Sequence, residues 1–166
     1  MRPNRLIGTP AGRLGPEDGA PVSARTGTGP VVWRDRHRLT MGDVDAAGIV
    51  FYANPYRWRE VVYTGWLLSV GHPLSQLLDS GFATPCVASS ARYLAPIRLD
   101  DVVDLSLVVE RVGTSSFDLR MDAVLAGPGL AVEVRTTNVW AARKPGGGLS
   151  AEPLPDWLVK ELSAAP

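Results

Sequence analysis

Residues 42–58 of the chain read GDVDAAGIVFYANPYRW. This segment places two carboxylates, Asp43 and Asp45, in a loop of small residues between an alternating stretch and a long apolar helical stretch. Free backbone N–H groups and the positive end of the helix dipole gather at the start of a helix. An aspartate just ahead of such a start is therefore well placed for chemistry on a carbonyl group. The alternative is that Asp43 or Asp45 only caps the helix.

The same segment resembles the signature of the 4-hydroxybenzoyl-CoA thioesterase family, which has the hotdog fold. The matching residues are, in order, Asp45, Ala47, Gly48, Ile49, Val50, Tyr52, Asn54, Arg57 and Trp58. A weaker likeness continues through Gly71, Thr84-Pro85, Asp100-Asp101-Val102 and Ser116-Phe117. The likeness spans residues 33–143. It implies a thioester hydrolase whose active sites lie between two subunits of a homodimer or homotetramer.

Alternation at a period of two predicts a strand ahead of the loop, over residues 33–40. The face expected to meet water carries Arg34, Arg36 and Arg38. The half-buried face carries Trp33, His37 and Leu39. On such a face we expect His37 to be a core or rim residue with satisfied hydrogen bonds rather than a catalytic base.

After the loop, residues 55–70 have the length of a helix, and Gly71 supplies its end. Apolar residues lie nearly all round this segment, so burial on every side is expected. Its start has two possible positions, because Asn54 resembles an N-cap whereas an oxyanion site would favour a turn that begins near Ile49. His72 is expected only to terminate the helix.

Three later segments also alternate, and turns at Gly113 and at residues 127–129 join them as antiparallel hairpins. Their alternating apolar residues are Leu105, Leu107 and Val109, then Phe117, Leu119, Met121 and Ala123, then Val132 and Val134. Residues 84–93 add a less regular strand, and residues 156–162 a short terminal helix. One long helix with about five mostly antiparallel strands is an α+β domain in which the sheet packs on the helix. This content and order match the hotdog fold.

The composition fits one globular domain, since the chain has 166 residues, of which 45% are hydrophobic and 20% charged. Residues 1–30 hold six glycines and five prolines, so we expect a mobile tail there, or a docking arm for a partner, ahead of a thioesterase domain at 31–166. The formal net charge is zero, and residues 31–166 carry 13 basic against 15 acidic groups. This balance argues against a nucleic-acid partner.

The single cysteine, Cys86, excludes an internal disulfide and is expected to be a small buried hydrophobe in a reducing compartment. No apolar run reaches the roughly 18 residues that a membrane-spanning helix needs. The N-terminus also lacks the apolar core of a secretory signal. We therefore expect a cytoplasmic protein without a membrane partner.

Several common catalytic motifs are missing from the sequence, including G-x-S-x-G, H-E-x-x-H and the phosphate-binding G-x-x-x-x-G-K-[ST]. The two histidines, His37 and His72, offer little material for a triad or a metal site, so no metal or cofactor is expected. Carboxylate chemistry remains, because an ionised aspartate can act as nucleophile or general base. Thioesters suit so weak a nucleophile, since their thiolate leaves readily.

In the resembling family the aspartate that matches Asp45 is catalytic, and the backbone N–H of the residue that matches Tyr52 polarises the thioester carbonyl. Backbone N–H groups between Val50 and Tyr52 would form this oxyanion site. Direct attack by Asp45 and activation of water by Asp45 both fit the sequence. We expect the substrate to be bound by Gly48, Val50, Phe51, Glu60, Arg92 and Arg111.

Two positions bear on the acyl group. Glu60 stands where an aryl-CoA member of the family has an acid that contacts the ring hydroxyl of its substrate, although a solvent-facing helix residue is the alternative. Ser75 stands where that member has an aromatic residue packed on the ring. This difference argues against a preference for 4-hydroxybenzoyl and leaves an aromatic or medium-chain acyl group as the expectation.

The turn that carries clustered cations for coenzyme A in that member here reads Val112-Gly113-Thr114-Ser115. Arg111 is the nearest cation. Either Arg92 or Arg98 replaces the cluster, or the acyl group arrives on the phosphopantetheine arm of an acyl-carrier protein. We expect coenzyme A, because most of the family uses it.

Two other classes of function are possible on this fold. A hydratase or dehydratase needs a catalytic histidine paired with an acid, and the sequence pairs neither His37 nor His72 with one. A non-catalytic acyl-binding protein would bind acyl-CoA tightly without turnover.

Overall fold

The computed structural model describes residues 29–164, and nearly all of the predicted N-terminal tail lies outside these described residues. The elements are, in chain order, β1 Val31–Arg38, the 3₁₀ helix η1 Met41–Asp43, α1 Asn54–Ser69, α2 Leu74–Asp79, β2 Phe82–Ala83, β3 Cys86–Tyr93, β4 Val102–Val112, β5 Ser116–Leu125, β6 Gly129–Val139, β7 Ala141–Arg143, β8 Leu149–Ala151 and α3 Asp156–Ser163. The predicted α+β class is confirmed.

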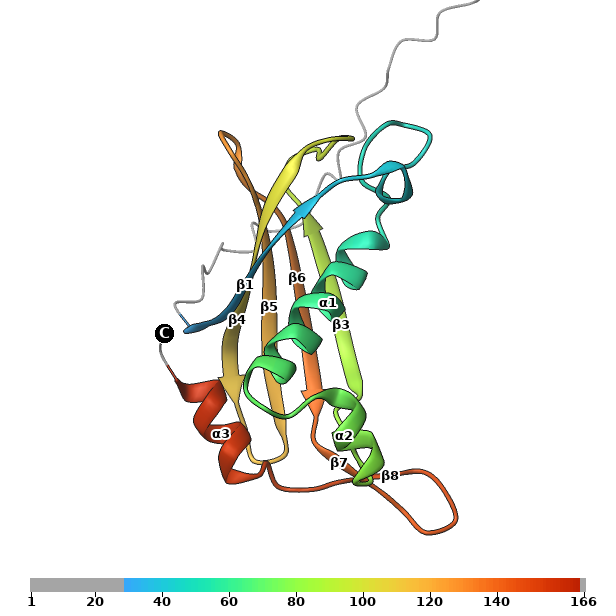
Figure 1. Ribbon diagram of the computed structural model, residues 1–166, viewed down its shortest axis with the longest axis vertical. Coiled ribbons are helices and arrows are strands. Elements are labelled where there is room, and N and C mark those ends of the chain that lie inside the picture. The colour runs from blue at the N-terminus through green and yellow to red at the C-terminus, as the bar shows by residue number, and fades with distance from the viewer. Residues whose placement is uncertain (1–28, 165–166) are drawn as a thin grey trace, which may run out of the picture.

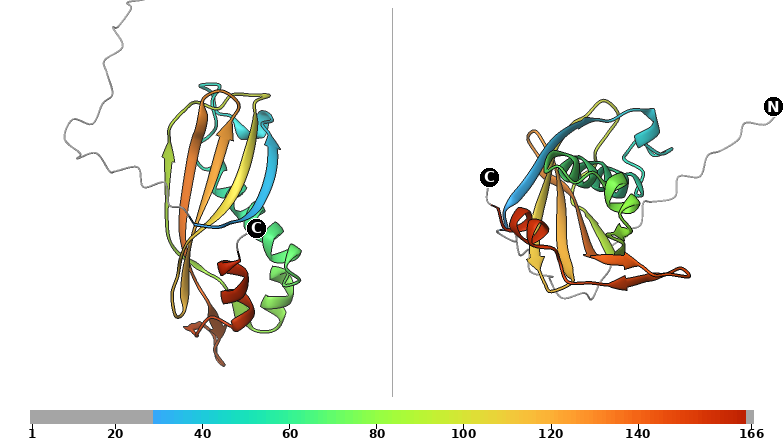
Figure 2. Two further views of the ribbon diagram at one scale, coloured as in Figure 1. Left: turned by 90° about the vertical axis from the view of Figure 1, so that its left-hand side faces the viewer. Right: turned by 60° about the horizontal axis from the view of Figure 1, so that its bottom comes forward.

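Five strands form one antiparallel sheet in the order β1-β4-β5-β6-β3. Helix α1 lies along one face of this sheet, and the strands curve around it (Figures 1 and 2). Alternate residues of β4, β5 and β6 belong to one buried core cluster together with Val62 and Trp66 of α1, which are almost completely buried. The predicted hairpins at Gly113 and at residues 127–129 are confirmed.

The expectation that α1 is buried on every side is wrong. Trp58, Val62 and Leu67 are at most 5% exposed, but Val61 is 58% and Leu68 65% exposed. The reason is that the described residues supply only one covering layer, the sheet, and the opposite side of α1 faces away from it. An apolar stripe is thus left on the outside of the helix.

A second, three-stranded sheet in the order β2-β7-β8 was not anticipated from the sequence. Its strands have two or three residues, too few to show a period of two. The predicted terminal helix is confirmed as α3, whose Trp157 stacks on the ring of His72 at 3.6 Å between centroids. In the described part of the chain, no helix has both the length and the apolar character required to cross a bilayer.

Strand β3 forms one edge of the large sheet and is exposed along most of its length. The expectation that Cys86 is buried is wrong, because Cys86 opens this edge strand and its thiol is exposed. Neighbouring Val87 is 61% exposed as well. Among residues 29–164, nothing pairs with the outer side of β3.

The strand register separates the two ends of the molecule. Arg38 lies opposite Val102 at one end of β4, so the loop that follows β1 and carries Asp45 lies at that end. The turn after Arg111 lies at the other end of β4, about 30 Å away at 3.3 Å per residue (Figure 1). Within one chain, therefore, Arg111 is remote from Asp45.

Candidate active site

Asp45 sits in a tight turn between η1 and α1. Its backbone N–H donates to Ile49 O at 2.9 Å, and Gly48 N–H donates back to Asp45 O at 2.9 Å. Gly48 has a φ of +73°, a left-handed conformation that costs a glycine little. The Asp45 carboxylate accepts the Ala47 N–H at 2.7 Å, which fixes the carboxylate while leaving it exposed.

The Asp45 side chain lines a depression of about 350 Å³. The opposite wall consists of Tyr93 from the end of β3 and the residues that follow it, including Pro96. Val50 and Tyr52, from the approach to α1, complete the lining. A carboxylate and the start of a helix therefore share one pocket, as the sequence predicts.

The backbone N–H groups of this segment are not equivalent. The Val50 N–H donates to Ile97 O at 2.8 Å, and the Phe51 N–H donates to Asp43 O at 2.8 Å. Among residues 29–164, the Tyr52 N–H has no acceptor. The expectation of an oxyanion site spread from Val50 to Tyr52 is therefore wrong for the first two groups, and Tyr52 is the donor that remains.

The structure at the start of α1 differs from the expected N-cap at Asn54 and from the alternative that an aspartate caps the helix. Asn54 is the first helical residue rather than the N-cap, which is Ala53 and makes no side-chain cap. The Asn54 side chain instead donates from Nδ2 to Gly42 O at 3.0 Å, which ties the helix to the 3₁₀ turn. Neither aspartate caps α1, so the capping explanation fails for both.

Asp43 is a buried hydrogen-bond acceptor next to the pocket. One carboxylate oxygen accepts the backbone N–H and the hydroxyl of Thr40, each at 2.8 Å. The other accepts Trp58 Nε1–H at 3.1 Å and lies 3.1 Å from His37 Nε2. Burial raises the pKa of Asp43, but the hydrogen bonds from Thr40, Trp58 and His37 outweigh burial and hold it below its ordinary value of 3.8.

His37 is thus paired with an acid, contrary to the expectation from the sequence. The pair lines a second depression of about 310 Å³, together with Arg57 and Trp58. This depression does not include Asp45 or Tyr52. The donors on Asp43 come from Thr40, from His37 on β1 and from Trp58 on α1, so this carboxylate ties the loop to both elements.

We predict that Asp43→Asn lowers the free energy of unfolding by about 2 kcal/mol at pH 7, because an amide cannot accept four hydrogen bonds. A lowered pKa in the folded state means that the stability from Asp43 is present above pH 3.8 and is lost as pH falls through the folded-state pKa. Urea denaturation of both proteins as a function of pH measures this. The gap between them should narrow in acid, and a gap independent of pH would contradict the prediction.

Asp104→Asn is the matched control. Asp104 pairs with Arg36 on the exposed face of the sheet, with Nε and Oδ1 2.7 Å apart. Because exposed ion pairs contribute little, this variant should lose less than about 1 kcal/mol.

Comparison with known proteins places this site in context. Residues 47–132, just over half of the chain, match the family model described as the thioesterase superfamily. A 1,4-dihydroxy-2-naphthoyl-CoA hydrolase from Thermosynechococcus vestitus is 30% identical over 139 residues, which cover 82% of this chain and 93% of that protein.

The chain belongs to the thioesterase superfamily.

It is therefore a thioester hydrolase, and the family that the sequence resembles is confirmed. A 4-hydroxybenzoyl-CoA thioesterase from Pseudomonas is 26% identical over 102 residues, covering 60% of this chain and 72% of that protein. The solved structure of a gentisyl-coenzyme A thioesterase is 28% identical and aligns with a TM-score of 0.67 over 76% of this chain and 98% of that one. These relatives confirm the hotdog fold.

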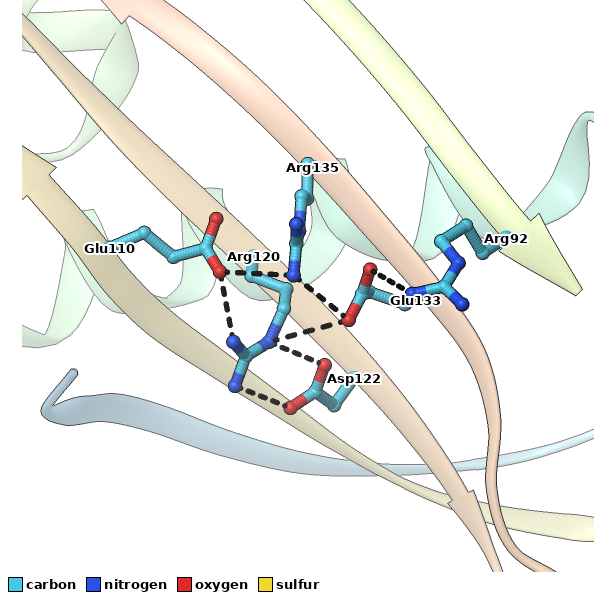
Figure 3. A network of polar contacts seen from close by, with 6 residues as sticks. All are labelled: Arg92, Glu110, Arg120, Asp122, Glu133 and Arg135. Atoms are coloured by element: carbon cyan, nitrogen blue, oxygen red, sulfur yellow. Dashed lines mark hydrogen bonds and ion pairs between the residues drawn. The ribbon is translucent and has the colours of Figure 1, made fainter. Parts of the chain in front are cut away.

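Two of the cations that this thioesterase was expected to use for substrate are engaged elsewhere. Arg92 lies on the sheet face away from α1, with its guanidinium 3.9 Å from Glu133 in a network of charged residues (Figure 3). Arg111 makes a two-point contact with Asp118, at 2.6 and 3.0 Å. The backbone of Arg98 bridges to Ile49, which lines the Asp45 pocket.

Glu60 extends from the exposed side of α1, and its carboxylate lies 3.4 Å from Arg59. Arg59 points inward and is 3% exposed, donating to Asn138 Oδ1 at 2.6 Å. Its burial was not visible in the sequence, because an arginine on an amphipathic helix ordinarily faces water. Ser75 is exposed on α2, away from the residues that line the Asp45 pocket.

Proposed function

We propose that the chain hydrolyses an aromatic acyl-CoA thioester in the pocket that contains Asp45 and Tyr52. The main support is that a fixed carboxylate and a backbone N–H without an acceptor among the described residues line or border the same depression. The relatives named above act on 1,4-dihydroxy-2-naphthoyl, 4-hydroxybenzoyl and gentisyl thioesters of coenzyme A. These names favour an aromatic acyl group over a medium-chain one.

In the proposed reaction, the thioester carbonyl oxygen accepts the Tyr52 N–H, which stabilises the negative charge that develops during attack. Asp45 then acts in one of two ways. It attacks the carbonyl carbon and forms an acyl anhydride that water hydrolyses, or it takes a proton from a water molecule that attacks directly. In both forms the coenzyme A thiolate leaves, and the products are a carboxylic acid and a thiol.

Glu60 is proposed to contact a polar substituent on the ring of the acyl group. Its side chain is 56% exposed, so its carboxylate is accessible to a ligand. The Asp45 pocket does not include Glu60, and the two would meet across an interface between two chains.

We also propose that the chain forms a homodimer or homotetramer, because it exposes apolar side chains on two of its elements. The outer side of α1 exposes Val61 and Leu68, and the β3 edge exposes Val87. A second copy that covered these residues would remove apolar surface from water.

We predict that full acyl-CoA is used at least about tenfold more efficiently than the corresponding acyl-pantetheine, because a cation that contacts a phosphate contributes this much or more. The measurement is kcat/KM for acyl-CoA, acyl-pantetheine and acyl-carrier protein with one aryl group. Arg98→Gln should reduce the preference for acyl-CoA over acyl-pantetheine. Arg34→Gln, which changes an exposed residue on β1, should leave this preference unchanged. Equal efficiency for the two small thioesters, with acyl-carrier protein ahead of both, would contradict the preference for coenzyme A.

The pairing of His37 with Asp43 makes hydration of an acyl-CoA a second reaction to be tested. A histidine held by an acid is the arrangement that a hydratase needs. Assays of enoyl-CoA hydration and of thiol release on the same preparation distinguish the two. Thiol release with no hydration is expected, because the pair lies outside the Asp45 pocket. Tight acyl-CoA binding without either reaction would favour a non-catalytic role.

A further inference from the structure

Tyr93 takes no part in the proposed reaction steps, yet it lines the same pocket as Asp45 and Tyr52. It is the last residue of β3, and its side chain is partly exposed. Its hydroxyl donates a hydrogen bond to the carbonyl oxygen of Tyr52, which is 41 residues away in the sequence. This contact joins the edge strand to the segment that carries the oxyanion donor.

The two peptide units on either side of the Tyr52 α-carbon are each held by a hydrogen bond. The unit that contains the Tyr52 N–H is held through its carbonyl, Phe51 O, which accepts the Asn54 N–H at 2.9 Å. The unit that contains the Tyr52 carbonyl is held by Tyr93. Together these contacts restrain the two peptide planes that meet at the Tyr52 α-carbon, and one of these planes carries the Tyr52 N–H.

The Tyr93 hydroxyl is suited to this contact across the neutral pH range. Burial raises the pKa of Tyr93 above its ordinary value of 10.0, and the phenols of Tyr56 and Tyr52 raise it further. The hydroxyl therefore keeps its proton and remains a donor. Because it is already bonded to a backbone oxygen, it holds the site in place rather than contacting the reacting carbonyl.

We infer that Tyr93 is a positioning residue, which holds the Tyr52 peptide so that its N–H points at the carbonyl oxygen of a thioester bound beside Asp45. This inference rests on the proposed function. Its physical basis is that a donor fixed in advance needs no reorganisation when charge develops on the oxygen. A donor that is free to rotate would lose part of that stabilisation in the transition state but little in substrate binding.

Tyr93→Phe tests this inference, because it removes the hydroxyl and keeps the ring. We expect kcat to fall about tenfold with KM unchanged, less than the ~100-fold or more that loss of an oxyanion donor itself causes. Tyr56→Phe is the matched control, since it removes a nearby phenol hydroxyl without a hydrogen bond to Tyr52 and should keep normal kcat. Thermal unfolding of both variants verifies that they fold.

A spectroscopic measurement separates positioning from a merely structural role. In an Asp45→Asn background, which keeps the thioester intact, isotope-edited infrared spectroscopy reads the stretching frequency of the bound aryl-CoA carbonyl. Polarisation by Tyr52 lowers this frequency. Adding Tyr93→Phe should raise it toward the value for free substrate, and adding Tyr56→Phe should not.

Equal kcat and equal carbonyl frequency for the two phenylalanine variants would overturn the inference and leave the proposed function intact. A loss of substrate binding rather than kcat in Tyr93→Phe would also overturn it, because positioning of the donor acts on the transition state. Absence of thioester turnover by the unaltered chain is a different result, and it would overturn the proposed function together with this inference.

Discussion

Asp45→Asn should lower kcat for aryl-CoA hydrolysis by at least about a hundredfold while substrate binding persists. The amide keeps the oxygen that accepts the Ala47 N–H at 2.7 Å, so the turn should retain its shape. What it loses is the negative charge needed for attack on the carbonyl or for removal of a proton from water. Thiol release measures the loss of kcat, and calorimetric titration with acyl-CoA measures whether substrate binding persists.

Asp101→Asn is a close control for this change. Asp101 also lies in a loop, and its carboxylate accepts a backbone N–H, that of Arg98, at 2.7 Å. It has no part in the proposed chemistry, so its variant should keep normal turnover. If Asp45→Asn also kept near-normal turnover while correctly folded, the assignment of Asp45 would be wrong.

A single turnover in water enriched in the heavy oxygen isotope tests whether Asp45 attacks the thioester directly. Covalent attack followed by hydrolysis of the anhydride can leave heavy oxygen in the Asp45 carboxylate, whereas activation of water leaves it only in the product acid. Heavy oxygen found by mass spectrometry in the peptide that contains Asp45 would demonstrate covalent attack.

Arg120→Met should lower the free energy of unfolding by about 3–5 kcal/mol, the largest stability effect that we expect. Arg120 is 6% exposed and lies at the centre of the charged network on the outer face of the sheet (Figure 3). It contacts Glu110 at 2.9 Å and Asp122 at 2.8 Å, and Glu133 lies 4.0 Å away. Burial lowers the pKa of Arg120, but its bonds to Asp122 and Glu110 reverse this and raise it.

The cost arises because removal of Arg120 leaves shielded carboxylates with less compensating charge, not because a buried ion pair is itself strongly stabilising. Acidification should therefore reduce the deficit, since protonation removes the charge of those carboxylates. Arg36→Met is the control, because Arg36 pairs with Asp104 on the same face but is 72% exposed. It should cost less than about 1 kcal/mol. Equal effects of the two changes would contradict a role for burial.

Predictions from the sequence were most accurate where the pattern is local. Alternation around Leu119 and Met121 located β5, and Gly71 located the end of α1, because strand faces and helix caps depend on residues within a few positions of each other. The loop with Asp45 was located for the same reason. The burial of α1 was mispredicted, because apolar residues around a helix do not show how many layers will cover it.

The sequence by itself determined that a carboxylate lies just ahead of a long helix and that the strands form antiparallel hairpins, because both follow from short-range periodicity and turn chemistry. Only the tertiary structure decided which backbone N–H remains without an acceptor. That depends on Ile97 and Asp43 accepting the N–H groups of Val50 and Phe51. It also decided that Tyr93 holds Tyr52 and that Arg111 lies far from Asp45. Strand register sets these relations, and register depends on pairings between residues that are distant in the chain.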